Sequence, residues 1–296
     1  MRKPNFFIVG APKCGTTAMY VYLKQHPDIF MSPEKEPAYF CPDLVTQRRS
    51  EADYLELFSA AVDEKRLGEA TSLYLYSKFA AREIKAFSPS ARIIIMLRNP
   101  LEMIHALHAQ FYYHCIEDIE DFGQALNAEE QRKRGQRLTP GGFPIERLFY
   151  REIAKYTGQI RRYMELFPPD QIKIIIFDDF KADTARLYRE TCDFLEVDST
   201  FSPAFDVINA NRKVRSRFLQ ELLEIPGPTL RKIGKPLTPR RVRHRVMNDL
   251  RRLNSFVQPR ERMNQQIRKT LQQEFAPEVR GLSELLGRDL THWCAS

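Results

Sequence analysis

The chain lacks the features that mark disulfide-bonded, metal-stapled and membrane-spanning proteins. Its five cysteines are odd in number, widely spaced and without a CxxC pair, which disfavours a disulfide framework or a zinc site and favours a reducing compartment. No run approaches the ~20 apolar residues of a membrane span, and no signal peptide is visible at the start of the sequence. We therefore expect a cytoplasmic protein.

Internal repeats and low-complexity tracts are also missing, so the sequence predicts no repeat architecture. The 296 residues, 43% hydrophobic and 28% charged, are typical of a soluble globular protein with one substantial core. The net charge of +8 predicts an anionic partner, such as a nucleotide, a sulfated or phosphorylated substrate, a nucleic acid or a membrane surface.

Three short β-prone runs alternate with helical patterns along the chain. Two of them are continuously apolar, as in strands that helices cover on both faces. The runs are Asn5–Val9, Ala91–Leu97 and Gln171–Phe177. The helical patterns are Thr16–Gln25, Glu51–Ala61, Ser77–Phe87, Leu101–His114, Arg147–Leu166, Lys181–Leu195 and Arg260–Leu290. This alternation predicts an α/β fold with a parallel sheet.

Two segments differ in composition from the rest of the chain. Cys115–Pro144 is polar, and we expect it to form a long connecting segment that contains a helix. Residues 212–252 contain 13 Lys/Arg and 3 Asp/Glu, a local excess larger than the net charge of the whole chain. We expect a single domain over residues 1–296, with a core at 1–217 and a basic helical C-terminal extension at 218–296.

The strongest chemical signal is the loop Gly10–Thr17, which lies between a predicted strand and a predicted helix. Backbone N–H groups of such a loop point inward, and the following helix N-terminus favours negative charge. Gly10 and Gly15 have the spacing of the nucleotide kinase pattern, but Thr16 stands where that pattern has lysine, and the lysine of this loop is Lys13. The loop therefore fits a phosphosulfate better than a nucleoside triphosphate that needs Mg²⁺ and a lysine along its terminal phosphates.

The chain resembles the sulfotransferase superfamily, in particular the bacterial and Golgi-type branch related to heparan sulfate sulfotransferases. Pro12–Thr17 is similar to the family's 5′-phosphosulfate loop, and Ile93–Pro100 is similar to its strand that ends in Arg-Asn-Pro. Weaker similarities extend to about Arg217 and include Lys35–Phe40, Gly68–Tyr74 and Tyr156–Leu166.

The resemblance implies a P-loop-like three-layer fold with a central parallel sheet flanked by helices. It implies 3′-phosphoadenosine 5′-phosphosulfate (PAPS) as co-substrate, and no metal. The implied nucleotide ligands are Lys13, Cys14, Gly15, Thr16 and Thr17 for the 5′ end, Arg98 for the 3′-phosphate, and Tyr156. A guanidinium suits that role because it forms fork-like, charge-assisted bonds to phosphate oxygens.

Three positions depart from the family pattern. Ala106 stands where the family has a serine that also binds the 3′-phosphate, a loss of about 1 kcal/mol or more, for which His105 or His108 offers a replacement donor. Ala70 and Ala38 stand where the glycan enzymes carry a lysine and a histidine, which argues against a glycosaminoglycan acceptor.

Sulfuryl transfer to oxygen needs a base near the sulfur to take the acceptor proton. The resemblance assigns this role to Glu36, with Lys13 as the second catalytic residue, and we expect Pro33, Pro37, Tyr39 and Phe40 to desolvate the carboxylate. A surface glutamate is the alternative interpretation. Histidine is the base in cytosolic members of the superfamily, but His105, His108 and His114 follow the 3′-phosphate motif and are expected to face phosphate or core.

The basic C-terminal third suggests further anion contacts. Arg212, Lys213 and Arg215 lie where related enzymes carry a loop over the nucleotide, and solvated charge is the alternative. Residues 239–252 are basic and partly amphipathic, which fits an anionic membrane surface or an acidic acceptor, with a solvated helix as the alternative. No recognised motif supports nucleic-acid binding.

The sequence therefore predicts a PAPS-dependent sulfotransferase that uses in-line attack assisted by a carboxylate base. A P-loop kinase, with the strand end at Asp178-Asp179 as magnesium site, and a catalytically inactive nucleotide-binding protein are the alternatives. The acceptor, whether small molecule, lipid or glycan, stays open because variable loops, here Pro42–Ser50 and Cys115–Pro144, build the acceptor pocket in this superfamily.

Overall fold

The computed structural model describes residues 2–138, 142–206, 212–224, 249–250, 253–258 and 261–295, with the backbone alone for 212–214 and 257. Contacts divide the chain into two compact units. The first comprises residues 1–104, 151–208 and 265–296, and the second comprises 105–150 and 209–264. Residues 265–295, which the sequence places in a C-terminal extension, are therefore part of the unit that contains the main sheet.

The first unit is built on a parallel sheet, and the predicted α/β fold is confirmed. Within the described part of this unit the sheet has five strands, in the order β2-β3-β1-β4-β5. Their bounds are β1 (Phe6–Gly10), β2 (Ile29–Met31), β3 (Arg66–Ala70), β4 (Arg92–Leu97) and β5 (Ile172–Ile176). All of β1 and all of β4 after Arg92 are buried, because helices cover both faces and these strands consist of apolar residues.

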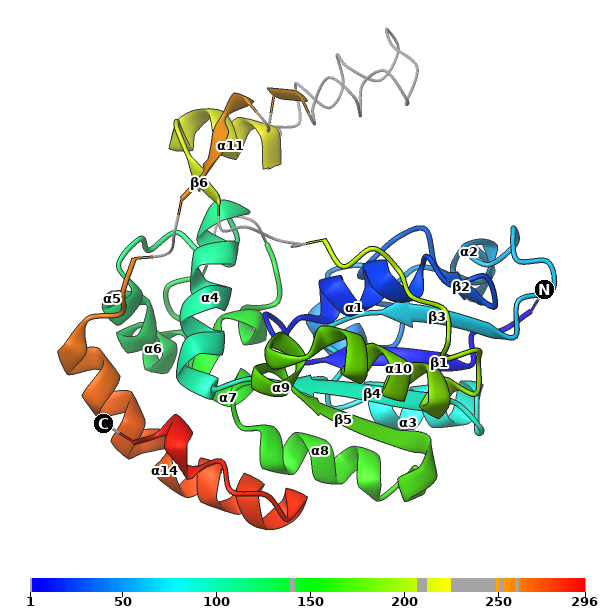
Figure 1. Cartoon of the computed structure of the whole chain (residues 1–296). Coiled ribbons are helices and arrows are strands. Elements are labelled where there is room, and N and C mark those ends of the chain that lie inside the picture. The colour runs from blue at the N-terminus through cyan, green and yellow to red at the C-terminus, as the bar shows by residue number, and fades with distance from the viewer. Residues whose placement is uncertain are drawn as a thin grey trace, which may run out of the picture. The chain divides into compact units, whose positions relative to one another are not determined.

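Helices flank this sheet on both faces (Figure 1). In that view α1, α9 and α10 cover one face, and α3 and α8 cover the other. The bounds are α1 (Thr16–Leu23), α2 (Glu51–Glu56), α3 (Ala80–Phe87), α8 (Tyr156–Met164), α9 (Phe177–Ala182), α10 (Thr184–Leu195) and α14 (Gln265–Leu286). Two helices, α4 (Pro100–Tyr113) and α7 (Tyr150–Ile153), span the boundary between the units. In the described part of the chain, no helix combines the length and apolar character needed to cross a bilayer.

Two predicted helices are interrupted in the structure. Asp183 separates α9 from α10, because its side chain accepts a hydrogen bond from the backbone N–H of Arg186 and caps the second helix. The predicted helix 147–166 breaks between α7 and α8, where the Gln159 amide donates to the backbone oxygens of Glu152 (2.9 Å) and Ile153 (3.1 Å). These side-chain bonds satisfy helix ends within an otherwise continuous apolar pattern.

The strand order places the two motifs of the sequence side by side. From β1 the chain goes to the edge strand β2, returns to β3 beside β1, and then crosses to β4 and β5 on the other side of β1. The point between β1 and β4, where the direction reverses, is where open α/β sheets bind ligands outside the carboxyl ends of their strands. Gly10 ends β1 and Arg98 follows β4, so both motifs lie at this point.

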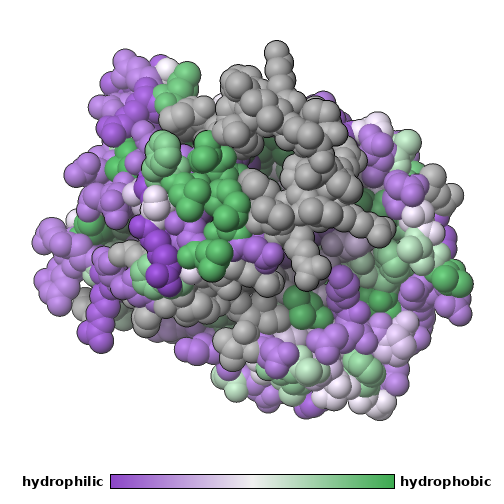
Figure 2. Space-filling model, turned by 90° about the horizontal axis from the view of Figure 1, so that it is seen from above, coloured by the Kyte–Doolittle hydropathy of each residue, from purple (hydrophilic) through white to green (hydrophobic). Residues whose placement is uncertain are grey.

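The second unit contains α5 (Phe122–Asn127), α6 (Glu129–Lys133), α11 (Arg217–Glu224) and a ribbon of β6 (Arg212–Val214) and β7 (Ser255–Val257). Figure 2 shows apolar side chains exposed beside strongly hydrophilic ones. The large apolar side chains exposed among the described residues of this unit include Leu138, Phe218, Leu222, Leu250, Leu253 and Phe256.

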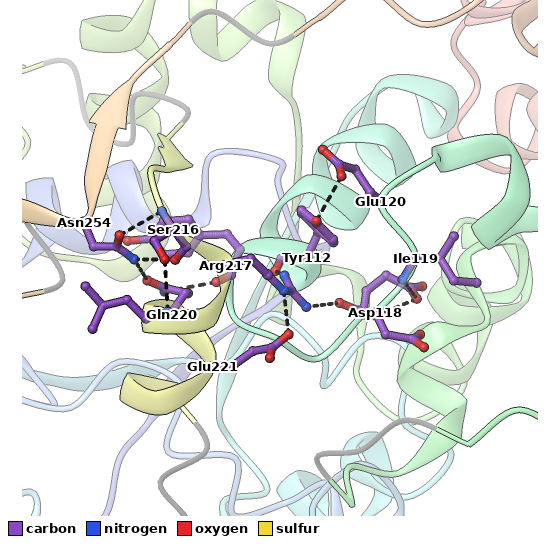
Figure 3. Close-up of polar contacts among 12 residues, drawn as sticks. Tyr112, Asp118, Ile119, Glu120, Ser216, Arg217, Gln220, Glu221 and Asn254 are labelled. Carbon is purple, nitrogen blue, oxygen red and sulfur yellow. Dashed lines mark hydrogen bonds and ion pairs between the residues drawn. The ribbon is translucent and has the colours of Figure 1, made fainter.

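A polar network holds α11 in the second unit (Figure 3). The Asn254 side chain accepts a hydrogen bond from the backbone N–H of Ser216 (3.0 Å) and donates to Gln220 (3.1 Å). Arg217 lies over the ring of Tyr112 and donates to the backbone oxygen of Glu117 (2.9 Å). Arg217, where the sequence similarity ends, therefore has a structural role.

Candidate active site

The loop Gly10–Thr17 depends on two glycines. Gly10 has φ +147°, and a Cβ there would lie 2.6 Å from the backbone oxygen of Ser72. Gly15 caps α1 with φ +89°, and a Cβ there would lie 3.1 Å from the Phe177 ring. Lys13 has φ +59°, a left-handed conformation that is uncommon outside glycine. The loop is therefore tightly folded between the segment at Ser72 and the start of α9.

The floor of the loop is a buried thiol and a buried phenol. Cys14 and Tyr156 are both fully buried, and the Cys14 thiol donates to the backbone oxygen of Pro12 (3.3 Å). Burial raises the pKa of Cys14 to about 12 and the pKa of the neighbouring Tyr156 well above its usual value. Cys14 can therefore offer a ligand only its backbone, and Tyr156, predicted as a nucleotide contact, lies buried beside Cys14.

Arg98 lies against the loop. Its guanidinium is 3.5 Å from the backbone oxygen of Lys13 and 3.8 Å from the Glu102 carboxylate, and it lies 5.0 Å from the centre of the Phe177 ring. A cavity of about 390 Å³ opens beside it, lined also by Phe177 and Lys181. The structure thus brings the lysine-bearing loop, the arginine and a second cation to one place.

Glu36 is connected to the loop through a single residue. Its carboxylate accepts hydrogen bonds from the backbone N–H and hydroxyl of Ser72 (2.8 and 2.9 Å) and from Lys35 (2.5 Å). Ser72 is also the residue that Gly10 approaches. The carboxylate is therefore held beside the beginning of the loop by three donors.

The expected desolvation of Glu36 is wrong. Its side chain is 39% exposed to solvent, because the aromatic residues that follow it pack into the core and do not cover it. Tyr39 stacks on Tyr54 with ring centres 4.4 Å apart, and Phe40 packs on Phe7 at 5.7 Å. The left-handed backbone of Glu36 (φ +60°) and Ala38 (φ +55°) marks the turn that separates the exposed carboxylate from these buried rings.

The desolvated carboxyl group near the site is Glu69. It is fully buried in β3 and accepts hydrogen bonds from the hydroxyls of Tyr54 (2.8 Å), Tyr74 (2.9 Å) and Thr71 (2.9 Å). Burial raises its pKa to about 7 against the three hydrogen bonds, which lower it. Thr71 in turn accepts from the backbone N–H of Ala38 (3.2 Å), so the cluster supports the turn that carries Glu36.

Glu69 should make the stability of the protein fall as pH rises. Because its pKa is raised from 4.5 to about 7, the folded state holds this proton more tightly than the unfolded chain between those values. Its favourable contribution is complete below about 4.5 and is lost as pH rises through about 7, up to about 3 kcal/mol at 1.36 kcal/mol per pKa unit. Urea unfolding should show wild type losing unfolding free energy relative to Glu69→Gln as pH rises from about 4.5 to above 7, and a pH-independent difference would contradict this.

Comparison with known proteins identifies the family. A family profile described as the sulfotransferase domain matches residues 3–217. The chain belongs to the sulfotransferase family. The crystal structure of a sulfotransferase from Alicyclobacillus acidocaldarius is similar over 100% of both chains, with 28% identity and a TM-score of 0.74. The predicted family and its P-loop-like layered fold are therefore confirmed.

Curated relatives of this sulfotransferase are longer proteins. The membrane-associated sulfotransferase kil1 of Dictyostelium discoideum is 32% identical over 267 residues, which cover 66% of this chain and 56% of the relative. The human bifunctional heparan sulfate N-deacetylase/N-sulfotransferase 3 is 26% identical, with 66% of this chain and 22% of the relative covered. The alignments thus span about half or less of these relatives.

The remaining predicted nucleotide ligands of this sulfotransferase lie in the second unit. Ala106 is buried on α4 and adds no donor. Its neighbour His108 is also buried and pairs with the backbone oxygen of Ile119 (2.9 Å), and burial lowers its pKa, so it does not replace the missing serine. Arg215 lies over the Phe256 ring. The side chains of Arg212 and Lys213, and most of 239–252, lie outside the described residues.

Several residues of the site are not predicted by the sequence. Ser72 and Glu69 lie in a motif that the sequence shows only as a weak similarity, and the apolar pattern places Phe177 at the end of a strand. One signal could have identified Glu69. It is a charged residue in the next-to-last position of a strand that lies beside the phosphate loop. The helix α9 starts at Phe177, four residues before the predicted start at Lys181. Lys181 therefore lies on α9, and its side chain lines the cavity.

Proposed function

We propose that this sulfotransferase transfers a sulfuryl group from PAPS to a hydroxyl or amine of an acceptor. The observation that carries the proposal is the meeting of Lys13 and Arg98 at the switch point of the sheet, 3.5 Å apart from backbone oxygen to guanidinium. One sequence motif supplies each residue, and together they match the two charged ends of the donor nucleotide.

The residues at this point fit such a nucleotide. A Cβ at Gly15 would fill the space in front of Phe177, so the loop can present backbone N–H groups to an anion at the N-terminus of α1. Lys13 neutralises charge at the 5′ end, with hydroxyls from Thr16 and Thr17. Arg98 holds the 3′-phosphate, and the cavity beside it receives the nucleoside. When bound, the donor supplies the activated sulfuryl group.

Glu36 acts as the general base in this proposal. Its exposed carboxylate retains lone pairs beyond the three that Ser72 and Lys35 occupy, and these accept the proton of the acceptor hydroxyl. Lys35 and Ser72 fix the carboxylate beside the beginning of the loop, because Ser72 is also the residue that Gly10 approaches. Glu69 and Thr71 hold the turn beneath it.

Arg98→Ala should weaken binding of adenosine 3′,5′-bisphosphate about 10- to 100-fold, because charge-assisted bonds to phosphate contribute about 1.5–3 kcal/mol. Isothermal titration calorimetry measures this. The matched control is Arg48→Ala, which removes an exposed guanidinium paired with Glu83 and should bind the nucleotide as wild type does. No binding to wild type, or equal binding by Arg98→Ala, would contradict the proposal.

Transfer of ³⁵S from labelled PAPS into acceptor extracts separates the alternatives. Labelled product supports the enzyme, whereas tight nucleotide binding without transfer to any acceptor favours the inactive nucleotide-binding protein. A kinase requires magnesium-dependent ATP turnover, which the threonine at position 16 and the family assignment both argue against.

A lipid or membrane-presented acceptor is the second part of the proposal. Residues 212–252 carry 13 Lys/Arg and 3 Asp/Glu, which leaves the rest of the chain with 33 basic and 35 acidic residues. Exposed apolar side chains lie within this basic segment of the sequence or directly after it, among them Phe218 (78% exposed) and Leu253 (73%). A segment that combines basic residues with exposed apolar ones suits an anionic bilayer. The relative kil1 is described as membrane-associated, and we propose that this chain is a cytoplasmic protein that binds such surfaces reversibly.

Phe218→Ser combined with Leu253→Ser should lower partitioning onto phosphatidylserine vesicles at least tenfold, because each buried side chain contributes about 1.5–3 kcal/mol. Co-sedimentation at rising salt measures it. Val62→Ser, which changes an apolar residue 79% exposed in the first unit, is the control and should leave partitioning unchanged. If partitioning onto the vesicles changed neither with salt nor with the double substitution, residues 212–253 would not be the membrane-binding segment.

A further inference from the structure

The cavity beside Arg98 is lined in part by residues outside the family match. The match ends at residue 217, yet His292 and Trp293 line this cavity together with Arg98, Asn99 and Phe177. They belong to a short 3₁₀ helix, Thr291–Trp293, that follows α14. The C-terminal segment thus reaches the same cavity as the Arg-Asn-Pro motif.

Trp293 is fixed to both sides of the cavity. Its indole N–H donates to the Asp178 carboxylate (2.8 Å) at the start of α9. Its backbone oxygen accepts from the Asn99 amide (2.9 Å), and the amide oxygen of Asn99 accepts from the N–H of Leu101 (2.9 Å). The middle residue of Arg-Asn-Pro therefore holds the C-terminal segment and caps α4 at once. The ring itself is nearly buried, at 3% exposure.

Ion pairs hold the rest of the C-terminal region to the same elements. Arg288 donates two hydrogen bonds to the Asp179 carboxylate, and one of them is 2.8 Å long. This pairing holds the pKa of the Asp179 carboxyl below its usual value. Arg268 on α14 pairs with Glu102 (2.7 Å), the carboxylate that also faces Arg98. The neighbouring carboxylates Asp178 and Asp179 on α9 thus each accept a hydrogen bond from a side chain that follows α14.

The chemistry of the cavity suits a nucleoside phosphate. Phe177 offers a partly exposed aromatic ring on which a base can stack, and the nearly buried Trp293 closes the cavity behind it. Arg98 and Lys181 supply positive charge, and the His292 side chain is 60% exposed beside Asp178. We propose that Thr291–Trp293 forms part of the nucleotide site, with Trp293 as a wall and His292 as a contact for the nucleoside end of the donor. This proposal rests on the proposed function.

Fluorescence tests the proposal directly, because Trp293 is the single tryptophan of the chain. Titration of the full-length protein with adenosine 3′,5′-bisphosphate should change its tryptophan emission in a saturable way. The dissociation constant from emission should equal the one from calorimetry on the same sample. A calorimetric signal without any change in emission would overturn the wall role of Trp293 and leave the proposed function standing.

Two variants test affinity. His292→Ala should raise the dissociation constant about fivefold, and Trp293→Phe, which keeps a ring but removes the donor to Asp178, about tenfold. His114→Ala, which changes a half-exposed histidine paired with Glu224 in the second unit, should bind as wild type does. Unchanged affinity in both cavity variants would refute the inference, whereas absence of calorimetric binding by wild type would refute the proposed function itself.

Discussion

Replacement of Lys13 by alanine is expected to lower the turnover number for sulfuryl transfer about a hundred- to a thousandfold. In the proposed function the ammonium group is the cation that the loop offers to the developing charge on the bridging oxygen, and loss of one such preorganised donor costs about 2.7–4 kcal/mol. Alanine keeps the Cβ, so the left-handed backbone at this position (φ +59°) bears the same strain in both proteins. Steady-state kinetics with labelled PAPS measures the change.

The control for Lys13→Ala is Lys133→Ala. Lys133 pairs with Glu130 (3.0 Å) on α6 of the second unit, and an exposed helical pair of this kind contributes about 0.3–0.5 kcal/mol. Its turnover should match wild type. If Lys13→Ala kept turnover within about threefold of wild type, the loop would not be where the sulfuryl group is transferred.

Glu36→Gln should reduce turnover about 10²- to 10⁴-fold, the range for loss of a general base. Glutamine keeps the length of the side chain and one oxygen that Ser72 can still bind, so the turn over Thr71 stays in place. Affinity for adenosine 3′,5′-bisphosphate should therefore be unchanged. Separate measurement of turnover and of nucleotide binding distinguishes loss of proton transfer from loss of structure.

The matched control for Glu36→Gln is Glu34→Gln. Both carboxylates lie in one charged run and pair with a cation, since Glu34 accepts from Arg49 (2.6 Å), but only Glu36 is bonded to Ser72 beside the loop. Glu34→Gln should be as active as wild type. Near-normal turnover in Glu36→Gln would mean that another group takes the proton.

The part of the site that the sequence predicts is the part that follows continuous apolar strands. The runs at β1 and β4 are unbroken by polar residues and end at Gly10 and Arg98, so strand type, loop position and ligand type can all be inferred locally. Parallel strands that are neighbours end at the same edge of a sheet. The structure shows that β1 and β4 are neighbours, whereas from the sequence only the family resemblance implied that Lys13 and Arg98 serve one ligand.

The strand β3 shows why the rest could not be predicted. Its sequence, Arg66–Ala70, contains an arginine, a glycine and a glutamate in five residues, so no apolar pattern marks it. Glu69 is acceptable in the core only because Tyr54 and Tyr74 donate to it. One of those tyrosines comes from a helix 15 residues earlier, and periodicity carries no information about such a partner.

Because α14 belongs to the unit that contains the main sheet, its removal from a shortened protein should have consequences. The inward residues of this helix, Leu271, Phe275, Val279 and Leu282, are at most 2% exposed, and Glu278 accepts from the backbone N–H of Thr157 on α8 (2.7 Å). A recombinant fragment that stopped at the family boundary would uncover the partners of all four apolar side chains. Protein engineers who truncate or fuse this enzyme should treat its last thirty residues or so as indispensable scaffold rather than tail.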